Sequence, residues 1–161
     1  MNRRRYFRLG IVLTAVALLV PTQANSQAMS GTSAISSRSA EVQGTKLHYL
    51  TAGHGPALIL LHGYTQTSRM WRPIIPRLAA KFTVIAPDLP GIGDSAIPVN
   101  GLDMKSAAAT IHALVKSLGV TKACVVGHDI GLMVAYAYAA QFPPETEKLV
   151  EMDAFLPGVP G

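Results

Sequence analysis

The segment "VVGHDIGLM", residues 125–133, places an acidic side chain in a tight turn between two regular elements. An apolar run rich in valine ends at Gly127, and a run of small and apolar residues typical of a helix follows Gly131. A Gly-x-x-x-Gly turn between a strand and a helix presents its central residue at the end of a sheet, and in many enzymes that residue is a nucleophilic serine. Here the central residue is Asp129. The pattern therefore predicts an exposed carboxylate nucleophile.

A carboxylate at this position favours attack on saturated carbon. Its ordinary pKa of ~3.9 leaves it ionised at neutral pH, whereas a serine needs a base before it can attack. An epoxide or a carbon–halogen bond offers a suitable carbon, and the product would be an alkyl ester of Asp129. Hydrolysis of that ester requires an oxyanion hole and a base for water. The alternative is that Asp129 caps the following helix; the flanking glycines and the preceding strand favour the nucleophile.

The strands expected around this turn alternate with helices. Apolar runs at 57–61, 82–86 and 123–126 predict buried strands, and 148–152 predicts a last strand. A hairpin is expected over 40–53, with its turn at Gly44. This alternation predicts an α/β fold with a mostly parallel sheet.

Three helical stretches separate the expected strands. The stretch at 70–78 is expected to be broken by its two prolines. A second helix should run from Met104 to Leu118, with Asp103 as its N-cap and Gly119 at its end. The helix after the turn should end at Phe142, before two prolines.

Three motifs resemble those of the α/β-hydrolase superfamily: "LLHGY" at 60–64, "APDLPGIGDS" at 86–95 and "VGHDIG" at 126–131. They occur in the family's order, each at the end of an expected strand, and the resemblance covers residues 41–161. The aspartate in the turn and the stretch at 62–95 resemble epoxide hydrolases. The resemblance implies an α/β-hydrolase fold with helices on both faces of the sheet. It covers only the N-terminal portion of that fold, without the cap and the C-terminal strands.

The resemblance also implies roles for individual residues. Asp129 would be the nucleophile, and the backbone N–H groups of Tyr64 and Ile130 would form the oxyanion hole. The residues expected to shape the supporting loops are His62, Gly63, Gly127 and Gly131.

The acid that orients the catalytic histidine follows the next strand in part of this family. Asp153 is the relay acid candidate on that basis, and Glu151, two residues earlier on the same strand face, is the second choice. The structural alternative for Asp153 is a turn residue at the end of the strand.

No histidine follows Asp129, although the resemblance implies a water-activating histidine near the family's C-terminus. The five histidines of the chain are His48, His54, His62, His112 and His128. None is expected to act as the base: His112, for example, lies on the polar face of its helix, and the side chain of His128 should point away from the site. Their spacing does not predict a metal site. The chain is therefore expected to be the N-terminal part of a longer enzyme or the product of a truncated gene, and to be inactive alone.

Two related activities are distinguished by side chains beside the nucleophile. Haloalkane dehalogenases of this fold hold the leaving halide with side-chain N–H donors at the positions of Tyr64 and Ile130, and fluoroacetate-type dehalogenases carry an arginine at the position of Ile130. Neither side chain present can serve in this way. Epoxide hydrolysis to a 1,2-diol is therefore the expected reaction, with haloalkane or haloacid dehalogenation, or a truncated non-catalytic pseudo-hydrolase, as alternatives.

The first 26 residues resemble a secretory signal peptide. Four arginines precede a twelve-residue apolar run, Leu9–Val20, which is shorter than the ~20 residues of a membrane span, and small residues follow. Residues 27–39 are expected to be a flexible leader and residues 40–161 the hydrolase core. The protein is expected to be secreted or periplasmic, by the Sec or the twin-arginine route.

The charge composition indicates which kinds of binding partner to expect. The net charge of +5 comes largely from the signal peptide, since ten basic and nine acidic residues remain after it. The near-neutral remainder does not predict nucleic-acid binding. A small-molecule substrate is expected, with no cofactor, no metal and no stable membrane anchor after cleavage; the sequence does not indicate an oligomeric state.

Overall fold

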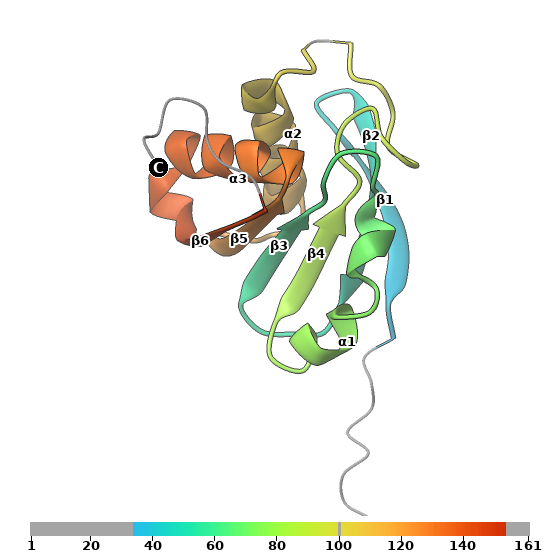
Figure 1. Cartoon of the computed structure of the whole chain (residues 1–161), viewed down its shortest axis with the longest axis vertical. Helices are drawn as coiled ribbons and strands as arrows, with labels where there is room; N and C mark the ends of the chain where they lie inside the picture. Colours follow the sequence, from blue (N-terminus) through green and yellow to red (C-terminus); the bar gives the residue numbers. More distant parts are fainter. Residues whose placement is uncertain (1–33, 100, 154–161) are drawn as a thin grey trace, which may run out of the picture. The chain divides into compact units, whose positions relative to one another are not determined.

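A computed structural model describes residues 34–99 and 101–153 of the chain (Figure 1). The predicted signal peptide lies outside these residues. The strands are β1 (Ser36–Val42), β2 (Thr45–Ala52), β3 (Ala57–Leu61), β4 (Thr83–Pro87), β5 (Ala123–His128) and β6 (Thr146–Met152).

Within the described residues, these strands form one six-stranded sheet in the order β1-β2-β4-β3-β5-β6. Strands β4, β3, β5 and β6 are parallel to one another, and strand β2 of the β1–β2 hairpin pairs with β4 in antiparallel orientation. The C-terminal ends of the parallel strands therefore meet at one edge of the sheet, where ligand sites of open α/β sheets form. This arrangement confirms the predicted α/β class and the mostly parallel sheet.

The first strand begins earlier than predicted. β1 starts at Ser36, and its pairing with β2 runs from Ser36 opposite Thr51 to Val42 opposite Thr45. Residues 36–39 were expected to belong to the flexible leader, so that boundary is wrong. The serine-rich composition concealed the strand because pairing along the edge of a sheet depends on backbone hydrogen bonds and not on apolar side chains.

Helices cover both faces of the sheet, as predicted (Figure 1). The helices are α1 (Ile75–Leu78), α2 (Met104–Ser117) and α3 (Ile130–Gln141), with short 3₁₀ turns η1 (Ser68–Trp71) and η2 (Pro143–Glu145). Helices α2 and α3 pack on one face, where Ile111 and Val134 meet Ile59 of β3. The segment from η1 to α1 packs on the other face, with Trp71 and Ile75 in its core. None of the described helices is long and apolar enough to cross a bilayer.

The predicted helix signals agree with the structure. The stretch expected to break at its prolines is split into η1 and the four-residue α1. The Asp103 carboxylate accepts hydrogen bonds from the backbone N–H groups of Lys105 and Ser106 at 3.0 Å each, and it caps α2 at the expected residue.

His112 was expected to be solvated, and that prediction is wrong. Its ring stacks on Phe142 with 3.6 Å between centroids, its Nε2 lies 3.1 Å from Oε2 of Glu145, and its side chain is 17 % exposed. The polar face of α2 is covered here by the end of α3 and by η2, a tertiary contact that helical periodicity does not show. His112 is thereby separated from the strand ends that carry the candidate site.

The start of α3 lies in close contact with the end of β3. A methyl group on Gly131 would come within 2.5 Å of the carbonyl oxygens of Leu61 and His62, and one on Gly127 would collide with the backbone of Gly131 and Leu132. Both glycines are therefore required for the approach of the helix to the sheet, as the sequence predicted.

A buried histidine joins the loops that follow β3 and β4. His62 is fully buried, its Nε2 accepts a hydrogen bond from the Leu89 N–H at 2.9 Å, and its Nδ1 donates to the Gly63 carbonyl at 3.0 Å. Because the Leu89 amide can only donate, the ring proton resides on Nδ1 and the imidazole is neutral. Burial lowers the pKa of His62 below its ordinary value, against the raising effects of the Gly63 carbonyl and of Asp88.

Asp88 organises the second of these loops. Its carboxylate accepts hydrogen bonds from the backbone N–H groups of Ser68 (2.7 Å) and Asp94 (2.9 Å), and from Nδ1 of His48 (2.9 Å). Burial alone would raise the pKa of Asp88, but these hydrogen bonds hold it below its ordinary value. The loop after β4 is therefore fixed against η1 and the hairpin.

We predict that Gly131→Ala destabilises the protein by about 3 kcal/mol, because the added methyl group meets backbone atoms that cannot move independently. The measurement is the free energy of unfolding in urea. Gly119→Ala is the matched control: Gly119 has a φ of +77° but no atom within 4 Å of the added methyl, so only the cost of the backbone conformation, about 1 kcal/mol, is expected. Equal losses in the two variants would contradict the close contact.

We predict that His62 makes stability fall on acidification. Its pKa is lower in the folded protein than in the unfolded chain, so the unfolded state takes up more protons as the pH falls below ~6.5. The difference in unfolding free energy between wild type and His62→Gln should therefore shrink between pH 8 and pH 5, by an amount set by the folded-state pKa. His54→Gln, at an exposed histidine, is the control for the substitution itself. A constant difference for His62→Gln would refute the prediction.

Candidate active site

Asp129 lies in the turn between β5 and α3 in an unusual backbone conformation, with φ of 52° and ψ of −122°. A non-glycine residue in such a conformation is strained by about 1–3 kcal/mol and needs support from its surroundings. That support comes from both sides: the Asp129 N–H donates to the Met152 carbonyl at 3.0 Å, and the Asp129 carbonyl accepts from the Leu132 N–H at 2.9 Å. The turn is therefore fixed between the end of β6 and the first turn of α3.

The carboxylate of Asp129 does not cap the helix. It makes no capping hydrogen bond to α3, and its Oδ2 instead accepts a hydrogen bond from the backbone N–H of Tyr64 at 2.8 Å. Tyr64 belongs to the loop that follows β3, 65 residues away in the sequence. The helix-cap interpretation is therefore wrong, and the half-buried carboxylate is directed toward the neighbouring loop.

This contact has a chemical consequence. An amide N–H on one carboxylate oxygen stabilises negative charge there and leaves the other oxygen, Oδ1, available to attack. Within the described residues, the Tyr64 N–H is placed on the carboxylate, whereas the Ile130 N–H makes no hydrogen bond to it. The Ile130 side chain packs against the core beneath α2 and α3.

The loop after β3 is held in shape by Gln66, a side chain that sequence patterns did not single out. The Gly63 N–H donates to Oε1 of Gln66 at 3.0 Å, and the Gln66 N–H donates to the Gly63 carbonyl at 3.2 Å. The sequence signal for this role was the four-residue turn from Gly63 to Gln66, which ends in a long polar side chain. Together with His62, which binds the same carbonyl, this turn fixes the Tyr64 N–H opposite Asp129.

The relay acid candidate lies beside a histidine. Asp153 follows β6, has a φ of 60°, and its side chain is 83 % exposed. Its Oδ2 lies 3.3 Å from Nε2 of His128, the residue before Asp129. The second choice, Glu151, is exposed on β6. The contact of His128 with Asp153 was not predicted; the signal was the parallel register of the adjacent ends of β5 and β6.

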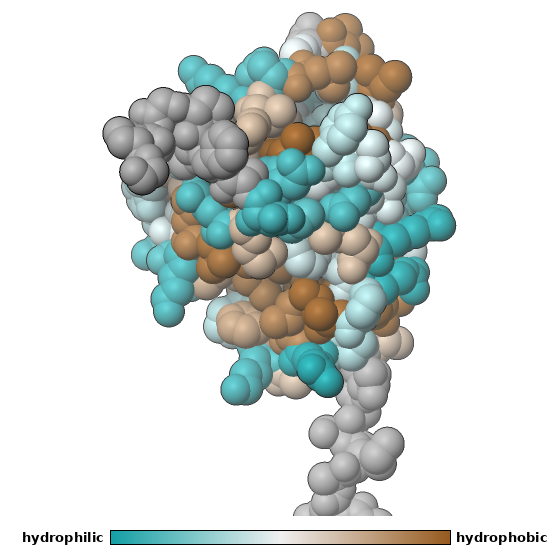
Figure 2. Space-filling model, in the orientation of Figure 1, coloured by the Kyte–Doolittle hydropathy of each residue, from teal (hydrophilic) through white to brown (hydrophobic). Residues whose placement is uncertain are grey.

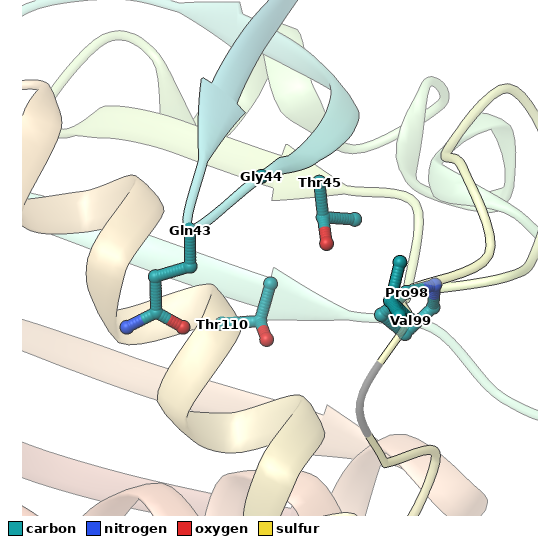
Figure 3. Close-up of a pocket in the computed structure, with 6 residues that line it drawn as sticks. All are labelled: Gln43, Gly44, Thr45, Pro98, Val99 and Thr110. Carbon is teal, nitrogen blue, oxygen red and sulfur yellow. The ribbon is translucent and has the colours of Figure 1, made fainter.

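Cavities occur elsewhere among the described residues. One, of about 330 Å³, lies between the β1–β2 hairpin and α2 (Figure 3), and its lining residues are Gln43, Gly44, Thr45, Pro98, Val99 and Thr110. The other, of about 270 Å³, is lined by Thr67, Arg69, Asp88, Gly93 and Asp94. Neither cavity is lined by Asp129.

The loop between β4 and α2 also carries exposed apolar side chains. Ile97, Val99 and Leu102 are 74 %, 92 % and 59 % exposed, and hydrophobic surface is visible over this loop near the upper end of the molecule in Figure 2. Because the loop follows a parallel strand, this surface lies beside the edge of the sheet that carries Asp129.

One group of residues has the composition of a metal site. The ligand atoms of His48, Asp88 and Asp94 lie within 4.8 Å of one another. However, His48 is bonded to Asp88 through Nδ1 and lies 2.7 Å from the Ser37 hydroxyl through Nε2, and Asp88 accepts two backbone hydrogen bonds. These contacts account for the cluster as a hydrogen-bond network that fixes the loop.

Comparison with known proteins supports the same fold. Residues 56–159 match the family described as alpha/beta hydrolase fold. The chain is 44 % identical over 125 residues to a soluble epoxide hydrolase of Corynebacterium sp. (strain C12), covering 78 % of this chain and 43 % of the relative. It is 33 % identical over 121 residues to a fluoroacetate dehalogenase of Burkholderia sp., covering 72 % and 40 %.

A solved structure, the epoxide hydrolase CorEH without ligand, superposes with a TM-score of 0.72 at 41 % identity, covering 78 % of this chain and 48 % of that one. The chain thus spans less than half the length of the relatives it matches. The matched region contains the strained turn at Asp129 and the loop that binds its carboxylate. By its fold and its sequence, the chain belongs to the α/β-hydrolase family.

Proposed function

We propose that the protein hydrolyses epoxides to 1,2-diols through a covalent ester on Asp129. The observation that carries this proposal is the position of the Asp129 carboxylate, which is free of helix capping and accepts the Tyr64 N–H on Oδ2 at 2.8 Å. An ionised carboxylate held in this way is a nucleophile that needs no base for its first step.

In the first step, Oδ1 of Asp129 attacks one carbon of the epoxide ring. A carbon–oxygen bond forms to Asp129, the carbon–oxygen bond of the ring breaks, and the ring oxygen takes up a proton from an acid. The Tyr64 N–H holds Oδ2 while charge leaves the carboxylate, so that Oδ1 is directed toward the substrate. The product is a hydroxyalkyl ester of Asp129.

In the second step, water attacks Cγ of the ester and the negative charge develops on Oδ2. We assign the stabilisation of this charge to the backbone N–H groups of Tyr64, already at hydrogen-bond distance, and Ile130, the first residue of α3. The base takes a proton from the attacking water. Collapse of the intermediate then breaks the bond between Cγ and Oδ1, and Oδ1 leaves as the alcohol oxygen and takes up that proton. The diol is released and the carboxylate is restored. Asp153 is assigned as the acid that orients the water-activating histidine, and none of the five histidines of this chain is assigned as that base.

A dehalogenase is the second candidate, because the fluoroacetate dehalogenase of Burkholderia sp. is 33 % identical to the chain. The same ester would form with loss of a halide ion. The side chains beside the nucleophile count against it. Tyr64 offers no N–H beyond its backbone amide, which is engaged by Asp129, and the aliphatic Ile130 packs against the core.

We also propose that the protein is exported. The basic segment before Leu9–Val20 and the small residues after it support a signal peptide over residues 1–26. Export by the Sec or the twin-arginine route would place the enzyme in the periplasm or outside the cell.

We predict that Asp129→Ala abolishes turnover of a terminal epoxide such as styrene oxide, with a loss of at least about a thousandfold in diol formation. In the full protein, wild type should show a transient mass increase equal to that of the epoxide on the peptide that contains Asp129, because the ester precedes the diol. Diol formation by chromatography and peptide mass spectrometry are the measurements.

Asp94→Asn is the matched control, since Asp94 is an exposed acid in the loop after β4 and is not assigned a role in the chemistry. It should retain diol formation within about twofold. Full turnover by Asp129→Ala would refute the proposed nucleophile. Halide release from an alkyl halide or from fluoroacetate, without diol formation from epoxides, would establish the dehalogenase instead.

A further inference from the structure

His128 lies between the two acidic residues of the site. On the β5 side it directly precedes Asp129, and on the β6 side its Nε2 is 3.3 Å from Oδ2 of Asp153. The two strand ends are joined by the hydrogen bond from the Asp129 N–H to the Met152 carbonyl, so the spacing between His128 and Asp153 is fixed by the backbone.

The other ring nitrogen of His128 faces the loop after β3. Nδ1 is buried and has no hydrogen-bond partner among the described residues. It occupies the space that a side chain on Gly63 would fill, since a methyl group there would come within 2.7 Å of Nδ1. A proton on Nδ1 would be buried without an acceptor, whereas a proton on Nε2 faces a carboxylate. The contacts therefore favour the tautomer that carries its proton on Nε2.

We propose that His128 is a positioning residue that holds the Asp153 carboxylate in place for ester hydrolysis. The inference rests on the proposed function, in which Asp153 is the relay acid. In this arrangement Nε2 of His128, 3.3 Å from Oδ2, offers its N–H to that oxygen, and Oδ1 stays free to accept a hydrogen bond from the imidazole that activates water.

Asp153 needs such support because no other contact among the described residues restrains its side chain. It lies just after the last residue of β6, has a left-handed φ of 60°, and its side chain is 83 % exposed. A carboxylate in this position samples several rotamers, and each wrong rotamer misplaces the base that it orients. A contact from the rigid end of β5 limits that freedom, because His128 itself is packed against Gly63.

Asp153 takes no part in ester formation, so the His128 contact should affect only the second chemical step. Loss of the His128 contact should slow ester hydrolysis and spare ester formation. A second expectation concerns the replacement side chain. It must supply an N–H donor at the position of Nε2, because a side chain whose donor lies at the position of Nδ1 does not reach Asp153.

The test compares His128→Gln with His128→Asn in the full protein. Glutamine places an amide N–H near the position of Nε2, while asparagine has the same group at the position of Nδ1. Rapid-quench mass spectrometry of a single turnover of styrene oxide gives the rates of ester formation and of ester hydrolysis separately. We expect His128→Asn to hydrolyse the ester roughly ten- to a hundredfold more slowly, with ester formation within about twofold of wild type. His128→Gln should recover most of the hydrolysis rate.

A double-substituted protein completes the comparison. In an Asp153→Asn background, His128→Asn should have no further effect on ester hydrolysis, because the contact is already lost. The proposal is overturned if His128→Asn hydrolyses the ester at the wild-type rate, if both steps slow equally, if His128→Gln is as slow as His128→Asn, or if the two substitutions act additively.

The protonation of His128 can be measured without replacing it. Histidine ¹⁵N NMR should show the proton on Nε2, and Asp153→Asn should shift the Nε2 resonance. A proton on Nδ1, or no response to Asp153→Asn, would overturn the proposal even if a His128 variant does not fold. If wild type forms no ester, the proposed function has failed, and the NMR result still decides whether His128 holds Asp153.

Discussion

The close approach of α3 to the end of β3 determines the geometry of this site. The approach is possible because Gly131 lies against the carbonyl oxygens of Leu61 and His62. It brings the strained turn at Asp129 beside the loop after β3, within reach of the Tyr64 N–H. A hydrogen bond of 2.8 Å between residues 65 apart in the sequence therefore depends on the absence of one side chain.

The loops at the strand ends are rigid for a related reason, since each is bound by a buried polar side chain with satisfied hydrogen bonds. The neutral His62 joins the loops after β3 and β4, and Asp88 joins the loop after β4 to η1 and the hairpin. A buried polar group without a hydrogen-bond partner destabilises the folded state, whereas one whose hydrogen bonds are satisfied restricts the movement of the segments that it joins. Their effect here is to hold backbone amides, which carry the oxyanion chemistry in our proposal, without any mobile side chain.

Much of this fold is encoded locally and could be predicted. The apolar runs predicted β3 and β5 almost to the residue, prolines split the segment from η1 to α1, and Asp103 capped α2 as expected. The turn at Asp129 was predictable because two glycines at this spacing, between a buried strand and a helix, are typical of the turn that presents a nucleophile.

Apart from the turn held by Gln66, the features that escaped prediction depend on partners distant in the sequence. The start of β1 at Ser36 depends on pairing with Thr51, the burial of His112 on Phe142, and the contact of His128 with Asp153 on the register of β5 and β6. The side-chain types at these positions do not predict the contacts, because serine, histidine and aspartate are also common in solvent-exposed positions. The sequence thus predicted which residues at the strand ends are candidates for the chemistry, but the contacts between those residues became known only from the structure.

The central claim, that a covalent ester of Asp129 is hydrolysed at its own carbonyl, is tested most directly by a single turnover in H₂¹⁸O with enzyme in excess of epoxide. Attack of water on Cγ places the heavy oxygen in the Asp129 carboxylate and leaves the first diol unlabelled. We therefore expect a mass increase of about 2 Da on the peptide that contains Asp129, as follows from nucleophilic catalysis. Labelled diol and an unlabelled Asp129 peptide would show that water attacks the epoxide directly, and would contradict the account.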